Sequence, residues 1–231
     1  MNRIEEKYWQ QDNPAHIYIH IPYCIKKCPY CDFTSVALAE ADVTVSYYFN
    51  LLYQEIEQAL DEASDTEVLS IYFGGGTPSL VDAQYIIGVL ERIRARRVLS
   101  SQCEITLEMN PGTLDVRNLE ALFSAGVNRL SIGLQSTHEK HLASLGRVHT
   151  LENFQHAYHE VRRIGFRNVS VDLILATPNQ SMEDLEADLA YILSLGPEHV
   201  SIYSLIIEEG TPFGDKYTEG EYPLPSPEIE R

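Results

Sequence analysis

Cysteine and basic side chains are scarce in this sequence, and long apolar runs are absent from it. Its 231 residues include four cysteines and one tryptophan. Four cysteines are too few for the disulfide-dense scaffolds of small secreted proteins. No stretch approaches the roughly 20 apolar residues of a membrane-spanning helix, and residues 1–16 have mixed charge without the apolar core of a secretory signal. These absences predict a cytoplasmic protein with reduced thiols.

Positive charge is also scarce. The chain has 17 lysine and arginine residues against 34 aspartate and glutamate residues, a formal net charge of −17. A protein that binds nucleic acid through its phosphates needs clustered lysine and arginine. The composition therefore argues against a nucleic-acid partner, and the acidity itself is typical of an ordinary well-solvated surface.

Strand-like and helix-like segments alternate along the chain. Apolar and β-branched runs predict strands over residues 16–22, 67–73, 103–109, 128–134, 168–175 and 199–205. Helical spacing predicts helices over residues 43–63, 82–97, 115–125, 138–145 and 151–164, with another after Ser181. The expected N-caps are Thr113, Thr150 and Ser181, and the expected glycines after helix ends are Gly126 and Gly165.

This alternation is typical of βαβ units with a parallel sheet. Six units build either an open, doubly wound sheet or an incomplete (β/α) barrel, and periodicity leaves both open. The strands carry apolar residues on both sides of the pleat, which predicts that both faces of the sheet are covered. In either architecture, functional loops follow the carboxyl ends of the strands, and the glycine-rich and polar clusters of this sequence lie there.

The last part of the chain differs from the rest. Residues 208–231 contain four prolines and three glycines and show no apolar periodicity. We therefore expect residues 1–207 to form the α/β domain and residues 208–231 to be a linker towards a C-terminal domain that this chain lacks.

Three of the cysteines are clustered directly after the first predicted strand. Cys24, Cys28 and Cys31 form a C-x3-C-x2-C array. Three thiolates do not complete a tetrahedral zinc site, although structural zinc remains an alternative. They do suit a [4Fe–4S] cluster with one iron open to another ligand. The fourth cysteine, Cys103, lies in the third predicted strand and is expected to be a small buried side chain.

With these cysteines on one loop, the sequence resembles the radical S-adenosylmethionine (SAM) superfamily. Four further segments are similar to the branch that contains oxygen-independent coproporphyrinogen III oxidase, namely residues 17–22, 74–80, 108–112 and 125–136. The resemblance covers about residues 16 to 225. It implies an incomplete (β/α)6 barrel, similar to a TIM barrel, with the cofactors at its carboxyl-end mouth.

The resemblance also implies which residues hold the cofactors. Cys24, Cys28 and Cys31 would bind the cluster, and the open iron would bind the methionine part of SAM. One electron then cleaves SAM to a 5′-deoxyadenosyl radical. The residues that match the SAM contacts of the family are Tyr18, Tyr30, Gly75, Gly76, Thr77, Glu108, Gln135, Arg147 and Asp172. The chain departs from the family at Ala176 and Thr177, where a Gly-Leu pair is usual.

A single residue separates two groups of this branch. The oxidases resemble C-x3-C-x2-C-x-C, whereas this chain has Phe33 in place of the last cysteine, as in a group of haem chaperones. The resemblance therefore implies haem binding and delivery to a haem-acceptor protein, with coproporphyrinogen III oxidation as the alternative. It also implies an electron donor such as a flavodoxin or ferredoxin, and a homodimer is plausible. Another radical SAM enzyme and a binding protein that keeps the cluster for structure remain open.

Overall fold

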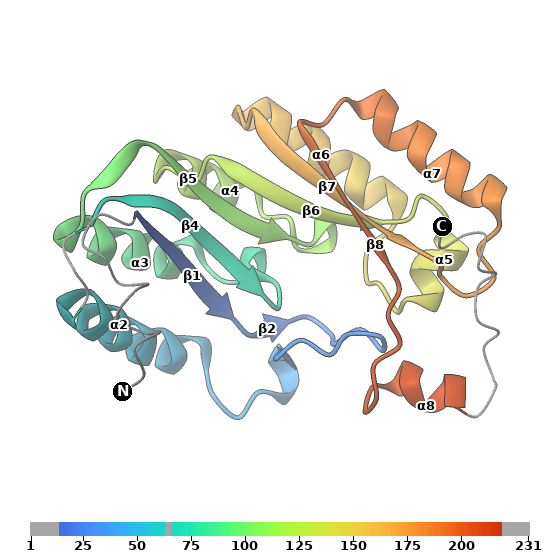
Figure 1. Cartoon of the computed structure of the whole chain (residues 1–231), viewed down its shortest axis with the longest axis horizontal. Helices are drawn as coiled ribbons and strands as arrows, with labels where there is room; N and C mark the ends of the chain where they lie inside the picture. Colours follow the sequence, from blue (N-terminus) through green and yellow to red (C-terminus); the bar gives the residue numbers. More distant parts are fainter. Residues whose placement is uncertain (1–13, 63–65, 219–231) are drawn as a thin grey trace, which may run out of the picture.

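Six parallel strands form the centre of the molecule (Figure 1). The computed structural model describes residues 14–62 and 66–218. The strands are β1 (Ala15–Ile21), β4 (Val68–Gly75), β5 (Leu99–Met109), β6 (Arg129–Gln135), β7 (Asn168–Leu175) and β8 (His199–Ser204). They lie side by side in the order β1-β4-β5-β6-β7-β8. The order never reverses, as it would in a doubly wound sheet, so the incomplete barrel is confirmed.

The connecting helices lie on the outer side of this curved sheet (Figure 1). They are α2 (Val45–Glu62), α3 (Ala83–Arg96), α4 (Val116–Ser124), α5 (Glu139–Ser144), α6 (Leu151–Ile164) and α7 (Met182–Leu195). Apolar side chains from helices and strands, such as Phe49, Ile71, Leu107 and Phe154, are fully buried between them. Burial of this apolar layer is the main term that stabilises the fold. Among the described residues, no helix has the length and apolar character that crossing a bilayer requires.

The inner face of the sheet is different, and here one expectation is wrong. Alternate residues of β6, β7 and β8 are polar, and the strand register aligns Ser131 with Ser170 and Ser170 with His199. The residues between them, such as Leu130 and Val171, are fully buried against the helices. Only the outer face is therefore apolar. Because side chains alternate across a strand, the inner side chains are available to line a cavity.

Helix ends follow the expected chemistry with one exception. Thr150 and Ser181 form capping boxes with Asn153 and Asp184, and both Gly126 (φ +101°) and Gly165 (φ +121°) have positive φ. The predicted cap Thr113 is wrong, because Asp115 caps α4 by accepting a hydrogen bond from the Asn118 backbone N–H.

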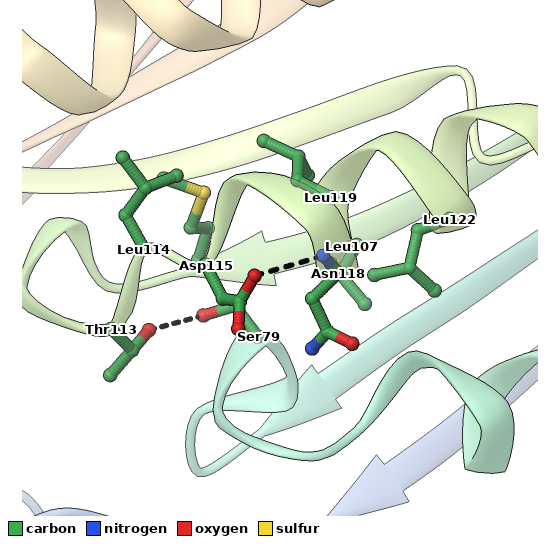
Figure 2. A pocket seen from close by; sticks show the side chains of 9 residues that line it. Ser79, Leu107, Thr113, Leu114, Asp115, Asn118, Leu119 and Leu122 are labelled. Carbon is green, nitrogen blue, oxygen red and sulfur yellow. Dashed lines mark hydrogen bonds between the residues drawn. The ribbon is translucent and has the colours of Figure 1, made fainter.

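A short 3-10 turn, η3 (Pro111–Thr113), separates β5 from α4 and displaces the cap by two residues. The Thr113 hydroxyl lies 2.7 Å from that of Ser79, which belongs to a second turn, η2 (Pro78–Leu80) (Figure 2). Both residues line the pocket of Figure 2, which has a volume of only about 10 Å³. A volume of that size admits about one water molecule. The pair is therefore a structural link between two strand-to-helix loops.

Two short strands that the sequence patterns do not predict bracket the cysteine loop. They are β2 (Tyr23–Cys24) and β3 (Val36–Ala37), which pair in parallel, and a 3-10 turn, η1 (Leu38–Glu40), follows them. The Val36 N–H also donates to the Pro22 carbonyl at 2.8 Å. The two ends of the loop are thereby fixed to one another.

The segment after β8 is more ordered than a linker would be. Residues 212–218 form a helix, α8 (Pro212–Thr218), where the sequence predicts a linker. Phe213 is almost fully buried, its N–H donates to the Pro29 carbonyl at 2.9 Å, and its ring packs edge-on against Tyr30. Burial of this aromatic side chain against the cysteine loop explains the helix. Residues 1–13 and 219–231 lie outside the described residues, and the domain boundary after residue 207 stays a prediction.

Candidate cofactor cavity at the carboxyl ends of the strands

One large cavity of about 840 Å³ lies at the carboxyl ends of the strands. Its size is at the upper end of what small-molecule sites occupy. All the candidate site residues except Tyr18 line it: Cys24, Cys28, Tyr30, Cys31, Gly75, Gly76, Thr77, Glu108, Gln135, Arg147 and Asp172. Residues that are far apart in the sequence are therefore brought to one cavity.

The cysteine loop forms one wall of the cavity. Cys24, Cys28 and Cys31 are free thiols, and the Cys31 N–H donates to the Cys28 carbonyl at 3.1 Å, which closes a turn between them. Burial raises the pKa of the Cys31 thiol. Two donors point at the sulfurs, with the Thr77 hydroxyl 3.6 Å from Cys24 Sγ and Arg147 Nη1 3.9 Å from Cys28 Sγ. Such donors stabilise thiolates, so the environment suits metal-bound sulfur.

The cysteine loop offers three thiols to the cavity as a donor set. Within residues 14–62 and 66–218, no three histidine, cysteine or acidic side chains lie close enough together to hold one metal ion. An iron–sulfur cluster bonds each cysteine to a different iron atom, so its cysteines need not converge on one point. The three-thiol donor set therefore fits a [4Fe–4S] cluster.

The glycine-rich turn after β4 leaves no room for side chains. Gly75 has φ +113°, and a Cβ placed on it would lie 2.6 Å from the His20 ring. A Cβ on Gly76 would lie 2.7 Å from the Tyr23 carbonyl oxygen. Bare backbone at this turn lets a ligand approach the chain closely. Both glycines are needed for the close packing of this turn on His20 and Tyr23, and a SAM contact at the turn stays a prediction.

Two carboxylates lie on the inner face beside that turn. Glu108 accepts hydrogen bonds from the Tyr72 hydroxyl at 2.8 Å and the Gly75 N–H at 3.1 Å, and burial raises its pKa. Asp172 accepts from the Ser131 hydroxyl at 3.0 Å, and burial raises its pKa as well. Ser170 also donates to Asp172, at 3.4 Å, as does Ser201. A carboxylate offers about four acceptor sites, so both side chains retain acceptor positions for ligand hydroxyl groups.

The loop after α5 brings a cation to the cysteine wall. Arg147 Nη2 donates to the Gly133 carbonyl at 3.3 Å, and its Nε is buried without a hydrogen-bond partner. Gly146, with φ +67°, packs so closely on Pro29 that a Cβ would lie 2.6 Å from the proline ring. Burial raises the pKa of the neighbouring Tyr30. An orphaned, buried guanidinium nitrogen is costly, and a carboxylate ligand would satisfy it.

Tyr18 is the candidate that does not line the cavity. Its side chain is 57% exposed and its ring stacks on Tyr72. The Tyr18 hydroxyl oxygen lies 3.1 Å from His20 Nδ1. The His20 Nε2 in turn lies 2.7 Å from the Thr34 carbonyl. Tyr18 therefore supports residues that border the cavity, and a direct SAM contact remains a prediction.

The wall at β7 consists of Asp172 and Ile174, and the departure at Ala176 and Thr177 lies beyond it. Ala176 has φ +58°, a conformation that favours glycine. The Thr177 side chain is buried and contacts His141 at 3.0 Å. The departure thus changes a loop behind the cavity and leaves the cavity wall intact.

Several cavity residues escaped the sequence analysis. Arg129, Ser131, Ser201 and Tyr203 line the cavity from β6 and β8. Their signal was the alternation of polar and apolar residues along these strands, which indicates a polar inner face. The sequence offers all eight histidines equally as candidate haem ligands, and among the cavity-lining residues His199 is the histidine.

His149 is a buried histidine behind the Arg147 loop. It is 3% exposed and its Nε2 lies 3.1 Å from the Leu134 carbonyl, so the neutral ring donates there. Burial and the charge of Arg147 lower its pKa to about 4. The folded protein therefore disfavours protonation of the His149 ring, which titrates near pH 6.5 in the unfolded chain.

This difference predicts a pH-dependent loss of stability. The unfolded chain binds the proton first, so the contribution of His149 is lost as pH falls from about 6.5 towards 4. Between pH 7 and pH 5 the expected loss of unfolding free energy is about 2 kcal/mol. Urea unfolding of wild type and of His149→Gln at both pH values measures it. A variant that loses as much stability as wild type over this interval would contradict the prediction.

Comparison with known proteins shows the family to which this chain belongs. Residues 18–192 match the Radical SAM superfamily. The heme chaperone HemW of Escherichia coli (strain K12) is 40% identical over 203 residues, which are 88% of this chain and 53% of that protein. The heme chaperone HemW of Bacillus subtilis (strain 168) is 36% identical, over 92% of this chain and 56% of that protein. The chain thus spans about half the length of the curated relatives it matches.

Among solved structures, the coproporphyrinogen III oxidase HemN of Escherichia coli superposes with a TM-score of 0.81. The two are 22% identical, and the match covers 98% of this chain and 52% of that one. At this identity the likeness establishes the fold. Membership of the superfamily implies a [4Fe–4S] cluster and SAM as cofactors. The chain belongs to the radical SAM superfamily and is HemW-like in sequence.

Proposed function

We propose that this chain binds a [4Fe–4S] cluster, SAM and haem, and delivers haem to haem-dependent proteins. The observation that carries the proposal is the shared cavity, in which three thiols, a glycine turn, two carboxylates and Arg147 meet. The identity of 40% to a protein named as a heme chaperone supports the haem part.

Each group of residues has a separate role in the proposal. Cys24, Cys28 and Cys31 hold the cluster, and Arg147 pairs with a carboxylate of SAM through its unsatisfied Nε. The carbonyl groups of Gly75 and Gly76, two residues that line the cavity, accept from an ammonium group of SAM. When bound, the cluster and SAM supply one-electron chemistry that the protein side chains lack.

Glu108, Asp172 and Gln135 complete the SAM site in this proposal. Ribose hydroxyl groups need paired acceptors and donors, and these side chains supply both from neighbouring strands. Thr77 supports Cys24 through its hydroxyl, and Tyr30 contributes an aromatic face on the cysteine loop. The polar inner face thereby orients SAM next to the thiols.

Phe33 favours haem delivery over oxidation of coproporphyrinogen III. It lines the cavity two residues after Cys31, at the position where the oxidases of the branch carry a further cysteine. A side chain without a transferable proton or metal-binding atom supplies contact area and no catalytic group.

The remaining parts of the proposal concern organisation and partners. Residues 1–207 are the cofactor-binding domain, and α8, which follows residue 207, packs on its cysteine loop. A flavodoxin or ferredoxin reduces the cluster, a haem-acceptor protein receives haem, and the chain forms a homodimer in the cytoplasm.

The test is an anaerobic haem titration of the cluster-reconstituted protein, followed by gel filtration. Haem that co-elutes at a fixed stoichiometry supports the proposal. If no haem is retained, haem delivery is wrong. Turnover of coproporphyrinogen III with SAM and a reductant would then identify the protein as an oxidase.

A further inference from the structure

Three large apolar side chains are exposed on the wall of the cavity. Phe33 is 60% exposed, Tyr203 61% and Ile206 66%, and all three line the same cavity. They come from two separate segments, the cysteine loop and the end of β8. Exposed apolar side chains on the wall of one cavity indicate a ligand that covers them.

SAM leaves this part of the wall uncovered in the proposed arrangement. Its polar groups are matched by the glycine turn, Glu108, Gln135 and Arg147, which lie on β4, β5, β6 and the loop after α5. Phe33, Tyr203 and Ile206 offer apolar contact area and one phenol hydroxyl group. A second ligand with a broad apolar face is the chemistry that matches them.

The backbone holds these side chains in place. The Phe33 carbonyl accepts from Lys27 Nζ at 3.0 Å, which links the two halves of the cysteine loop while the Phe33 ring stays exposed. Tyr203 is aligned with Ile174 in the β7–β8 register, and Ile174 lines the same cavity. The two exposed aromatic rings are therefore presented by a tied loop and by a paired strand, which lowers the entropy lost when a ligand binds.

We propose that Phe33, Tyr203 and Ile206 form the contact surface for the face of the haem ring. This inference rests on the proposed haem-binding function and adds the location of the ligand. A flat, largely apolar macrocycle buries contact area against two aromatic rings and a branched aliphatic side chain. The porphyrin then lies in the same cavity that the cysteine loop lines.

The test is titration of the cluster-reconstituted protein with haem and, separately, with metal-free protoporphyrin IX. Phe33→Ala and Tyr203→Ala are each expected to lower the affinity for both ligands by about tenfold. The triple variant, which combines them with Ile206→Ala, is expected to lower the affinity further. Both ligands should respond alike, because the contact is with the ring and not with the iron. Iron content, sulfide content and SAM binding are expected to equal those of wild type.

Two variants outside the cavity provide matched controls. Tyr47 on α2 is 56% exposed and Leu193 on α7 is 76% exposed, and neither lines the cavity. Tyr47→Ala and Leu193→Ala should leave haem affinity unchanged. Wild-type haem affinity in Phe33→Ala and Tyr203→Ala would overturn the inference and leave haem binding itself standing. Failure of wild type to bind haem would overturn both the proposed haem binding and this assignment of its contact surface.

Discussion

Replacement of Cys24, Cys28 and Cys31 with alanine is expected to abolish binding of iron and inorganic sulfide. The three thiols line one cavity and are the cysteines of the loop after β1. A cluster held by three protein thiolates has no other attachment to the chain, so the loss is from about four irons per chain to none. Iron and sulfide analysis after anaerobic reconstitution measures it, together with the loss of visible absorption.

The fourth cysteine supplies the control. Cys103 is 7% exposed and lies in β5, away from the cavity-lining residues. Cys103→Ala should retain full iron content and lose about 1 kcal/mol of stability, because one small buried side chain is shortened. Wild-type iron and sulfide content in the triple variant would refute the cluster assignment.

Gly76→Ala is expected to destabilise the protein by about 3 kcal/mol and lower its Tm by about 6 to 12 °C. The new Cβ would lie 2.7 Å from the Tyr23 carbonyl oxygen and 2.9 Å from the Pro22 carbonyl carbon. Both neighbours are backbone atoms of the segment that enters the cysteine loop. They cannot retreat easily, because the Gly76 N–H donates to the Ile21 carbonyl at 2.7 Å and the Thr77 N–H to the Tyr23 carbonyl at 2.7 Å.

Gly196→Ala separates this steric effect from the general effect of replacing a glycine. Gly196 has φ +59°, and a Cβ there would meet no atom within 4 Å. Its replacement should cost about 1 kcal/mol through backbone strain alone. Thermal unfolding of the two variants beside wild type measures the difference. Equal losses would show that the close approach at Gly76 is unimportant.

Local chemistry made most of the fold predictable. Alternating strands and helices, the capping boxes at Thr150 and Ser181 and the glycines after α4 and α6 are short-range features, and each was recognisable from neighbouring residues. The choice between barrel and doubly wound sheet was different. It depends on which strands pair with one another, and the periodicity of a single strand does not reveal its partner. Only the resemblance to a family favoured the barrel.

The wrong or missing predictions share a physical cause, which is contact between distant segments. The helix α8 depends on burial of Phe213 against Pro29, and the strands β2 and β3 depend on pairing across the cysteine loop. Thr113 lies in η3, where it contacts Ser79, and α4 begins after this turn with Asp115 as its cap.

The site was predicted where motifs exist and missed where they do not. The cysteines and the glycine turn have characteristic spacing, whereas Ser131 and Ser201 belong to a polar inner face that is marked by alternation along the strands and by no motif. Tyr18 was assigned by motif to a direct contact, yet its ring stacks on Tyr72 outside the cavity lining.

The contact between α8 and the cysteine loop couples metal loading of the loop to local unfolding of α8. Phe213 is fixed by Pro29 and Tyr30, which lie between Cys28 and Cys31. The strands β1 and β8 are at opposite ends of the sheet order, so this contact joins the two edges of the open barrel without strand pairing. Whatever rigidifies the loop also protects the chain from Leu205 to Thr218 against local unfolding. Metal loading and hydrogen-exchange protection of α8 thus report on a single linked equilibrium.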